Sequence, residues 1–169
     1  LGPEMKSTGE ALGIASTWQE ALYKGFLGAG LKIRKKADGT GTVLATLRER
    51  DRAEALPVIK KFIEAGFSIA ATEGTHRFLE EHGISAKKTA WEGTETTILD
   101  GLRAGEYSLV INTPSRGRDK DRTGFRIRRA AVEHNCPCLT SIDTAAALAS
   151  SIAREQGIVP EPLDIASLF

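Results

Sequence analysis

The feature that most constrains the fold is a regular alternation of short apolar runs with helical patterns, which begins near residue 42. Val43-Leu44-Ala45-Thr46-Leu47 is a run of strand type, and Leu56, Ile59 and Ile63 then recur at helical spacing. Strands are predicted at 43–47, 67–71, 85–89, 107–112 and 137–142, and helices at 53–65, 76–82, 96–104, 123–134 and 144–154. Five strands separated by helices indicate βαβ units. The predicted fold class is therefore α/β, a Rossmann-like three-layer domain around a central, mainly parallel five-stranded sheet.

Residues 1–38 do not share this alternation. They contain one predicted helix, 17–27, with Thr17 as its N-cap and Glu20 as the partner in a capping box. Trp18, Leu22 and Phe26 lie at helical spacing along it. We therefore divide the chain into a linker region, 1–38, and a main domain, 39–169.

Composition excludes several classes of protein. The 23 basic and 22 acidic side chains give a formal charge of +1, so nothing favours nucleic acid or an anionic membrane as the main partner. No run approaches the roughly 20 apolar residues of a membrane-spanning helix, and the first residues lack the pattern of a signal peptide. Cys136, Cys138 and three scattered histidines form no convincing zinc ligand set. We expect a cytoplasmic globular protein without metal.

A polar turn, Thr72-Glu73-Gly74-Thr75, follows the second predicted strand and leads into a helix. The unpaired N–H groups at a helix start and the helix dipole favour a phosphate, and Gly74 lets the backbone approach it closely. The alternative is that Thr72 or Thr75 simply caps the helix.

A basic segment follows the fourth predicted strand. Between Thr113 and Arg129 the chain has seven basic and two acidic residues. Arginines beside Asn112 and Thr113 suit a phosphorylated ligand, although such a segment can also be a solvated loop. After the fifth strand, Asp143 is interpreted as a helix N-cap. The carboxyl ends of parallel strands meet at one edge of a sheet, and the convergence of these turns favours a phosphate site there.

The same edge offers no catalytic constellation. Glu73, Glu92 and Glu95 could approach it, but no histidine, cysteine or lysine is placed to form a nucleophile–base pair. The sequence also lacks a P-loop and a G-x-G-x-x-G motif.

Several motifs, taken in chain order, carry a resemblance to a known family. They are Thr72-Glu73-Gly74-Thr75, Glu92-Gly93, Gly105-Glu106-Tyr107, Ile111-Asn112-Thr113, Gly124-Phe125-Arg126-Ile127-Arg128-Arg129 and Leu139-Thr140-Ser141-Ile142-Asp143-Thr144. From about residue 42 to 149 the chain resembles the C-terminal regulatory domain of the carbamoyl-phosphate synthase large subunit, a methylglyoxal-synthase-like domain. Residues 1–10 look like the tail of that subunit's second ATP-grasp unit. The 124–129 and 138–141 stretches look most like members of the pyrimidine branch in Gram-positive bacteria.

The resemblance implies an allosteric domain that binds a phosphorylated effector such as UMP or phosphoribosyl pyrophosphate. That effector would regulate carbamoyl phosphate synthesis for pyrimidine or arginine biosynthesis. The family's nucleotide-phosphate pocket corresponds to Thr46, Arg52, Thr72, Thr75, Lys88, Asn112 and Thr113. Gly74 of the polar turn and Arg116 of the basic segment complete the predicted set. Arg52 stands where the family usually has lysine, and Lys88 is shifted by one position against Thr89.

The resemblance also implies the partners. They are the remaining domains of the large subunit and the glutaminase small subunit, and ATP with Mg or Mn belongs to those other domains. No catalytic residue and no cofactor are therefore expected in this fragment. The stripe of Trp18, Leu22 and Phe26 would face the upstream domain, so we expect it to pack poorly within this chain and to be open to a homo-oligomer contact.

Two alternatives come from other functional classes. A methylglyoxal synthase on the same fold would carry an Asp-Pro at the fourth strand's end and an aspartate on the preceding helix, where this chain has Thr113-Pro114 and Glu95. The second carboxylate needed for proton abstraction is therefore missing. A nucleic-acid module using the Arg116 to Arg129 segment would lack interleaved aromatic residues and an overall basic charge.

Overall fold

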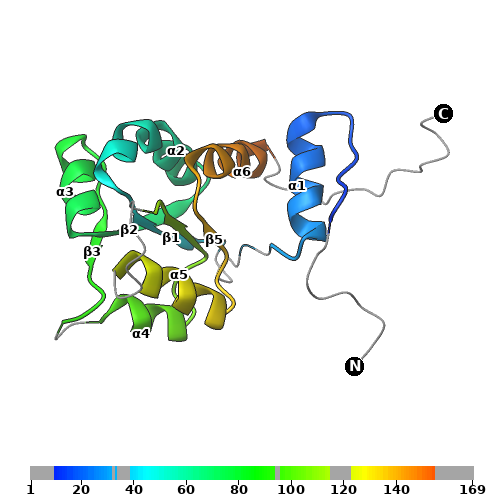
Figure 1. Cartoon of the computed structure of the whole chain (residues 1–169). Helices are drawn as coiled ribbons and strands as arrows, with labels where there is room; N and C mark the ends of the chain where they lie inside the picture. Colours follow the sequence, from blue (N-terminus) through cyan, green and yellow to red (C-terminus); the bar gives the residue numbers. More distant parts are fainter. Residues whose placement is uncertain (1–9, 32, 34–38, 94–95, 115–122, 155–169) are drawn as a thin grey trace, which may run out of the picture.

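The computed structural model describes residues 10–31, 33, 39–93, 96–114 and 123–154 (Figure 1). The strands are β1 (Gly41–Thr46), β2 (Phe67–Thr72), β3 (Lys87–Thr89), β4 (Leu109–Asn112) and β5 (Cys138–Leu139). The helices are α1 (Trp18–Gly28), η1 (Glu49–Asp51), α2 (Arg52–Glu64), α3 (Glu73–Glu81), α4 (Ile98–Arg103), α5 (Thr123–Glu133) and α6 (Ile142–Arg154). The strands form one sheet in the order β3-β2-β1-β4-β5, and each neighbouring pair is parallel. The predicted α/β fold with a five-stranded parallel sheet is confirmed.

The sheet separates two apolar cores, one on each face. Val43 belongs to the core that Phe62 of α2 and Leu148 of α6 complete. Leu44, the next residue, belongs to the opposite core with Ile98 of α4 and Ile127 of α5. Successive side chains of a strand point to opposite faces, so β1 contributes residues to both cores. Figure 1 shows α2, α3 and α6 on one side of the sheet and α4 and α5 on the other.

Two of the helix starts that differ from the sequence-based expectation bear on the polar turns. α3 begins at Glu73, three residues earlier than predicted, because Thr72 is already the extended residue before the helix. The polar turn is therefore the first turn of α3 rather than a loop in front of it. α6 begins at Ile142, so Asp143 lies inside its first turn and is not its N-cap. A carboxylate in the first turn still interacts favourably with the helix dipole.

The helix of the linker region, α1, packs against the main domain instead of standing free. Thr17 caps it by accepting a hydrogen bond from the Glu20 N–H, whereas the Glu20 carboxylate pairs with Lys24 at 2.9 Å. Tyr23 and Phe26 pack against the core that α2 and α6 share. The expectation of poor packing is therefore wrong for the side of α1 that carries Tyr23 and Phe26.

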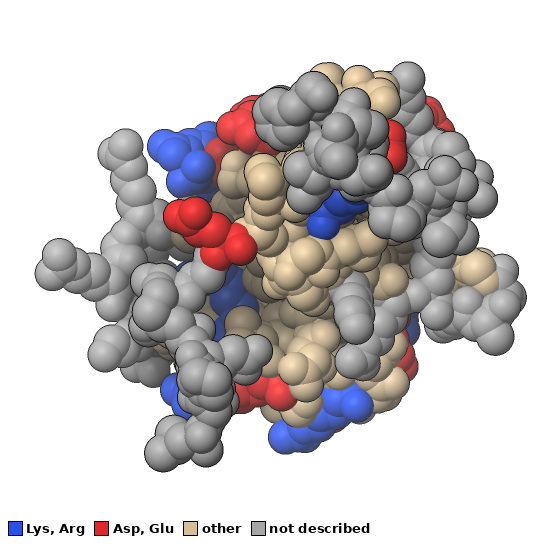
Figure 2. Space-filling model, turned by 90° about the vertical axis from the view of Figure 1, so that its right-hand side faces the viewer, with Lys and Arg blue, Asp and Glu red and all other residues tan. Residues whose placement is uncertain are grey.

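The exposed apolar side chains of α1 lie at its two ends, at Trp18 and Leu27. The Trp18 side chain is 61% exposed. Figure 2 views the molecule from the α1 side, where uncharged residues fill the middle of the face and charged residues lie mostly toward the rim. None of the helices in the described ranges is both long and apolar enough to cross a membrane.

A candidate anion site at the carboxyl edge of the sheet

The strand order places the candidate site at a topological switch point. β1 is the middle strand of the sheet. β2 and then β3 follow it toward one edge, and β4 and then β5 follow it toward the other. Thr46, the last residue of β1, is opposite Asn112, the last residue of β4. In open parallel sheets, ligands bind outside the carboxyl ends of the strands at such a reversal. Predicted site residues therefore flank the crevice that this fold class uses.

The first turn of α3 has no side-chain cap. Thr72 occupies the N-cap position, but its hydroxyl makes no capping hydrogen bond. Thr75 is 1% exposed, and its Oγ1 accepts a hydrogen bond from the Leu47 N–H at 2.9 Å and donates to the Leu47 carbonyl at 3.4 Å. Neither threonine is thus a simple side-chain cap, and the first N–H groups of α3 stay available to an external acceptor.

Arg52 lies over this helix start. It is the first residue of α2, and its Nε donates to the Leu47 carbonyl at 3.4 Å. A Cβ added to Gly74 would come within 2.6 Å of Arg52 Nη2, which places the guanidinium directly against the first turn of α3. Among the described residues, no carboxylate lies within ion-pair distance of Arg52. An unpaired guanidinium beside uncapped N–H groups is suited to a bound anion.

Lys88 reaches the same region from β3 but is already paired. Its Nζ forms an ion pair with Glu73 Oε2, and Arg77 lies 3.5 Å from the other oxygen of that carboxylate. The hydrogen bond from Lys88 is the main reason that the pKa of Glu73 is lowered, although a partial loss of hydration opposes it. A ligand that used the Lys88 ammonium would compete with Glu73 for it.

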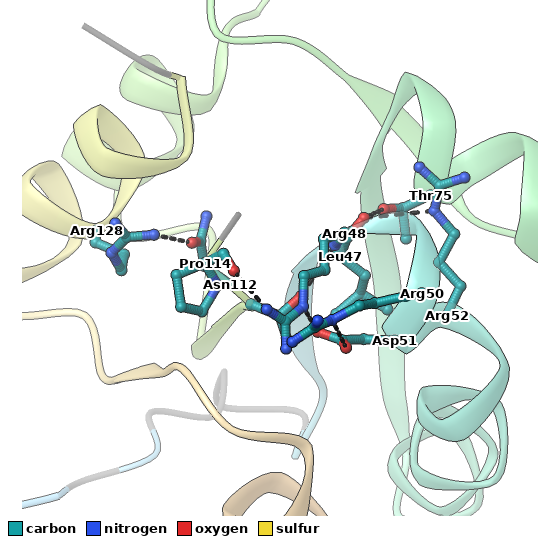
Figure 3. Close-up of polar contacts among 10 residues, drawn as sticks. Leu47, Arg48, Arg50, Asp51, Arg52, Thr75, Asn112, Pro114 and Arg128 are labelled. Carbon is teal, nitrogen blue, oxygen red and sulfur yellow. Dashed lines mark hydrogen bonds and ion pairs between the residues drawn. The ribbon is translucent and has the colours of Figure 1, made fainter. Parts of the chain in front are cut away.

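On the β4 side, Asn112 is held by an arginine that the sequence did not assign to the site. Asn112 is 1% exposed, and its Oδ1 accepts a hydrogen bond from Arg128 Nη1 at 2.5 Å (Figure 3). Arg128 comes from α5, and no carboxylate of the described residues pairs with it. Arg128 is one of three arginines in the stretch 126–129, and nothing in the sequence distinguished it from Arg126, which pairs with Glu92 at 2.8 Å.

A second missed residue is Asp51, the last residue of η1 and the N-cap position of α2. Its carboxylate is ion-paired with Arg48 Nε and lies 3.6 Å from Arg50 Nε. Burial alone raises the pKa of Asp51, but hydrogen bonds from Arg48 and Thr113 and the two nearby positive charges bring it below its ordinary value. Thr113 also accepts a hydrogen bond from the Arg48 N–H at 2.9 Å. The Thr113 hydroxyl is therefore engaged within the protein.

The structure thus brings eight of the nine predicted site residues to one edge. The turns after β1 and β2 and the end of β4 contribute Thr46, Arg52, Thr72, Gly74, Thr75, Asn112 and Thr113, and β3 contributes Lys88. Arg116 lies outside the described residues, as does Glu95. Within the described ranges, no three His, Cys, Asp or Glu side chains come together to hold a metal ion.

Comparison with known proteins identifies the family. Residues 54–140 match the MGS-like domain family. The carbamoyl phosphate synthase large chain of Clostridium botulinum (strain Loch Maree / Type A3) is 46% identical over 92% of this chain. The large chain of Lachnoclostridium phytofermentans is 48% identical over 90% of it. This chain spans 14% of the length of these relatives.

The fold itself is similar to that of a solved structure. A methylglyoxal synthase from Elizabethkingia anophelis aligns with a TM-score of 0.51 and 17% identity, over 66% of this chain and 78% of that one. At this identity the likeness concerns the fold alone. Relatives that are 46–48% identical over 90–92% of this chain are large chains of carbamoyl phosphate synthase, and the chain belongs to the MGS-like domain family.

Proposed function

We propose that this chain is the allosteric module of a carbamoyl phosphate synthase large chain and that it binds a phosphorylated effector such as UMP or phosphoribosyl pyrophosphate. The phosphate sits on the first turn of α3, where the N–H groups have no side-chain cap. The observation that carries this proposal is the Arg52 guanidinium, which lies against Gly74 without a carboxylate partner among the described residues. Uncapped N–H groups, the positive end of the helix dipole and a guanidinium all favour a dianion at this point.

The remaining residues of the edge suit the rest of such an effector. Asn112 and Arg128 lie across the switch point from Arg52, on the β4 side of this sheet edge (Figure 3). Arg128 brings a second guanidinium that no described carboxylate neutralises. Two separated cationic groups are suited to a ligand with one phosphate and further polar groups, or to one with two phosphorylated positions.

The relatives support a proposed biological role. They are large chains of carbamoyl phosphate synthase, of which this chain spans 14%. We propose that the effector regulates carbamoyl phosphate synthesis, in pyrimidine or arginine biosynthesis, through the remaining domains of the large chain and a glutaminase small subunit. ATP and its metal ion belong to those other domains, and the whole assembly works in the cytoplasm.

The module itself does no chemistry in this proposal. A methylglyoxal synthase places an aspartate before the proline at the end of the fourth strand, and this chain has Thr113 there. Thr113 carries no carboxylate to abstract a proton, and its hydroxyl oxygen accepts a hydrogen bond from the Arg48 N–H at 2.9 Å. An assay for methylglyoxal formation from dihydroxyacetone phosphate should show no activity above background.

Calorimetric titration of the 169-residue chain with UMP, IMP and phosphoribosyl pyrophosphate tests the proposal. At least one of them should bind, and Arg52→Gln should weaken it about ten- to a hundredfold, because a charge-assisted hydrogen bond contributes roughly 1.5–3 kcal/mol. Arg103→Gln is the matched control, since it removes the same charge from the end of α4, away from this edge. Equal weakening by both variants, or no binding of any ligand, would overturn the proposal.

A further inference from the structure

We propose that Asp51 is a positioning residue for the anion site and that Thr113 acts through it rather than by contacting the ligand. The buried Asp51 carboxylate fixes the turn after β1 to the turn after β4, and this fixed distance sets the place of Arg52. The inference rests on the proposed function, because it concerns the same edge and the same ligand.

The contacts form a closed ring between two segments that are far apart in the sequence, and Figure 3 shows the part of it that leads from Asp51 through Arg48 to Pro114. Asp51 pairs with Arg48 Nε, and the nearby Thr113 hydroxyl helps to lower the Asp51 pKa. The Arg48 N–H donates to Thr113 Oγ1 at 2.9 Å, and Arg48 Nη1 donates to the Pro114 carbonyl at 3.0 Å, 66 positions along the chain. Every contact in the ring joins the β1 turn either to itself or to the end of β4.

Burial of the charge makes this ring resistant to opening. Asp51 is 7% exposed, so separation of the two turns would leave its carboxylate buried without its partners. Removal of one partner from a buried charge is far more costly than the loss of an exposed ion pair. The two turns are therefore expected to move as one unit. Arg52 follows Asp51 directly, and its backbone position is fixed by the same unit.

The ring also suggests a role for Thr113 other than the direct ligand contact that the sequence predicts. Its hydroxyl oxygen accepts from the Arg48 N–H at 2.9 Å, which uses one acceptor position within the protein, and the same hydroxyl helps to lower the Asp51 pKa. Thr113 is 6% exposed. A direct hydrogen bond from this hydroxyl to an effector would compete with its interaction with Asp51. Thr113 and Asp51 are thus expected to influence ligand affinity through one shared interaction.

A double-mutant cycle tests this inference. Asp51→Asn, Thr113→Val and the double variant are titrated calorimetrically with UMP and with phosphoribosyl pyrophosphate, well below the melting temperature of each protein. Each single variant should raise the Kd about tenfold, and the double variant should raise it by about the same factor, because residues that act through one contact are not additive. Asp100→Asn, which removes the carboxylate of the α4 capping box, should lower the melting temperature without changing the Kd.

The outcomes separate the two proposals. If the unaltered chain binds neither titrant, the proposed function fails and the role of Asp51 fails with it. If the unaltered chain binds and Asp51→Asn lowers only the melting temperature, Asp51 is purely structural and this inference alone is wrong. If the effects multiply to about a hundredfold, Thr113 contacts the ligand directly and the inference is also wrong. Should Asp51→Asn not fold, Arg48→Gln replaces it in the same cycle, with the same interpretation.

Discussion

The guanidinium of Arg52 occupies the space that a side chain at position 74 would need, since a Cβ on Gly74 would come within 2.6 Å of Nη2. Gly74 lies in the first turn of α3 and does not have a positive φ. An alanine is therefore compatible with the backbone there. The steric conflict falls on the far end of the flexible Arg52 side chain, which must move away from the helix start.

Gly74→Ala should consequently separate binding from stability. The melting temperature should stay unchanged or rise slightly, because alanine is favoured over glycine in a helix by about 1 kcal/mol. The effector Kd should rise about tenfold, because the displaced guanidinium loses a charge-assisted hydrogen bond. Gly25→Ala in α1 is the control, where the nearest atom is 3.8 Å away and no arginine is displaced. Unchanged effector affinity in Gly74→Ala would show that Arg52 does not bind the ligand from this position.

Thr75→Ala should lower stability as well as affinity. The Thr75 hydroxyl is buried and bridges α3 to the Leu47 backbone, so its loss leaves the Leu47 N–H buried without that acceptor. We expect a loss of about 1–3 kcal/mol in the free energy of unfolding, measured by urea denaturation. Thr75→Ser keeps the hydroxyl and should recover most of this loss. Equal destabilisation by the alanine and serine variants would mean that the methyl group, and not the hydrogen bonds, matters here.

The linker helix offers a matched pair of aromatic substitutions. Phe26 packs against the shared core of α2 and α6, whereas Trp18 is 61% exposed. Phe26→Ala should lower the free energy of unfolding by about 2 kcal/mol, and Trp18→Ala should change it by less than about 0.5 kcal/mol. Urea midpoints at constant m-value provide the measurement. The reverse order would show that α1 does not dock as described.

The depressed pKa of Asp51 predicts a specific acid sensitivity. In the unfolded chain an aspartate titrates at about pH 3.9. In the folded protein burial raises the Asp51 pKa, but Arg48, Thr113 and Arg50 together hold it below its ordinary value. The ionised carboxylate therefore stabilises the fold above about pH 4, and this contribution is lost as the pH falls through the depressed folded pKa. Between about pH 4 and pH 2, the free energy of unfolding should fall more steeply in the unaltered chain than in Asp51→Asn. The other acidic groups are common to both proteins, so parallel curves would contradict the assigned environment of Asp51.

Much of the fold was predictable because it depends on local patterns. β1, β2 and β4 lie within one or two residues of the predicted strands, since each is a short apolar run between helix-forming segments. The ends of the sheet were harder, because edge strands pair on one side only. β5 retains only Cys138–Leu139 of the predicted 137–142 strand, and β3 only Lys87–Thr89 of 85–89.

The candidate site was predictable in its location but not in its contacts. The strand ends and their polar residues follow from topology, and Thr46 indeed lies opposite Asn112. The partners of Thr75 and Thr113 depend on which buried backbone groups face them, 28 and 65 positions away. No local pattern encodes such distances. Asp51 was missed for the same reason, because Thr113, which helps to lower its pKa, follows β4, far along the chain.

The proposed phosphate site is tested most directly by mapping backbone amide chemical-shift changes as the 15N-labelled chain is titrated with UMP and with phosphoribosyl pyrophosphate. We expect saturable shifts that are largest at Gly74 and Thr75, where the N–H groups of the α3 start meet the phosphate, with smaller shifts at Asn112. Shifts confined to the groove between α4 and α5, which Trp91, Phe125 and other residues line, would contradict it. So would the absence of saturable shifts with either ligand.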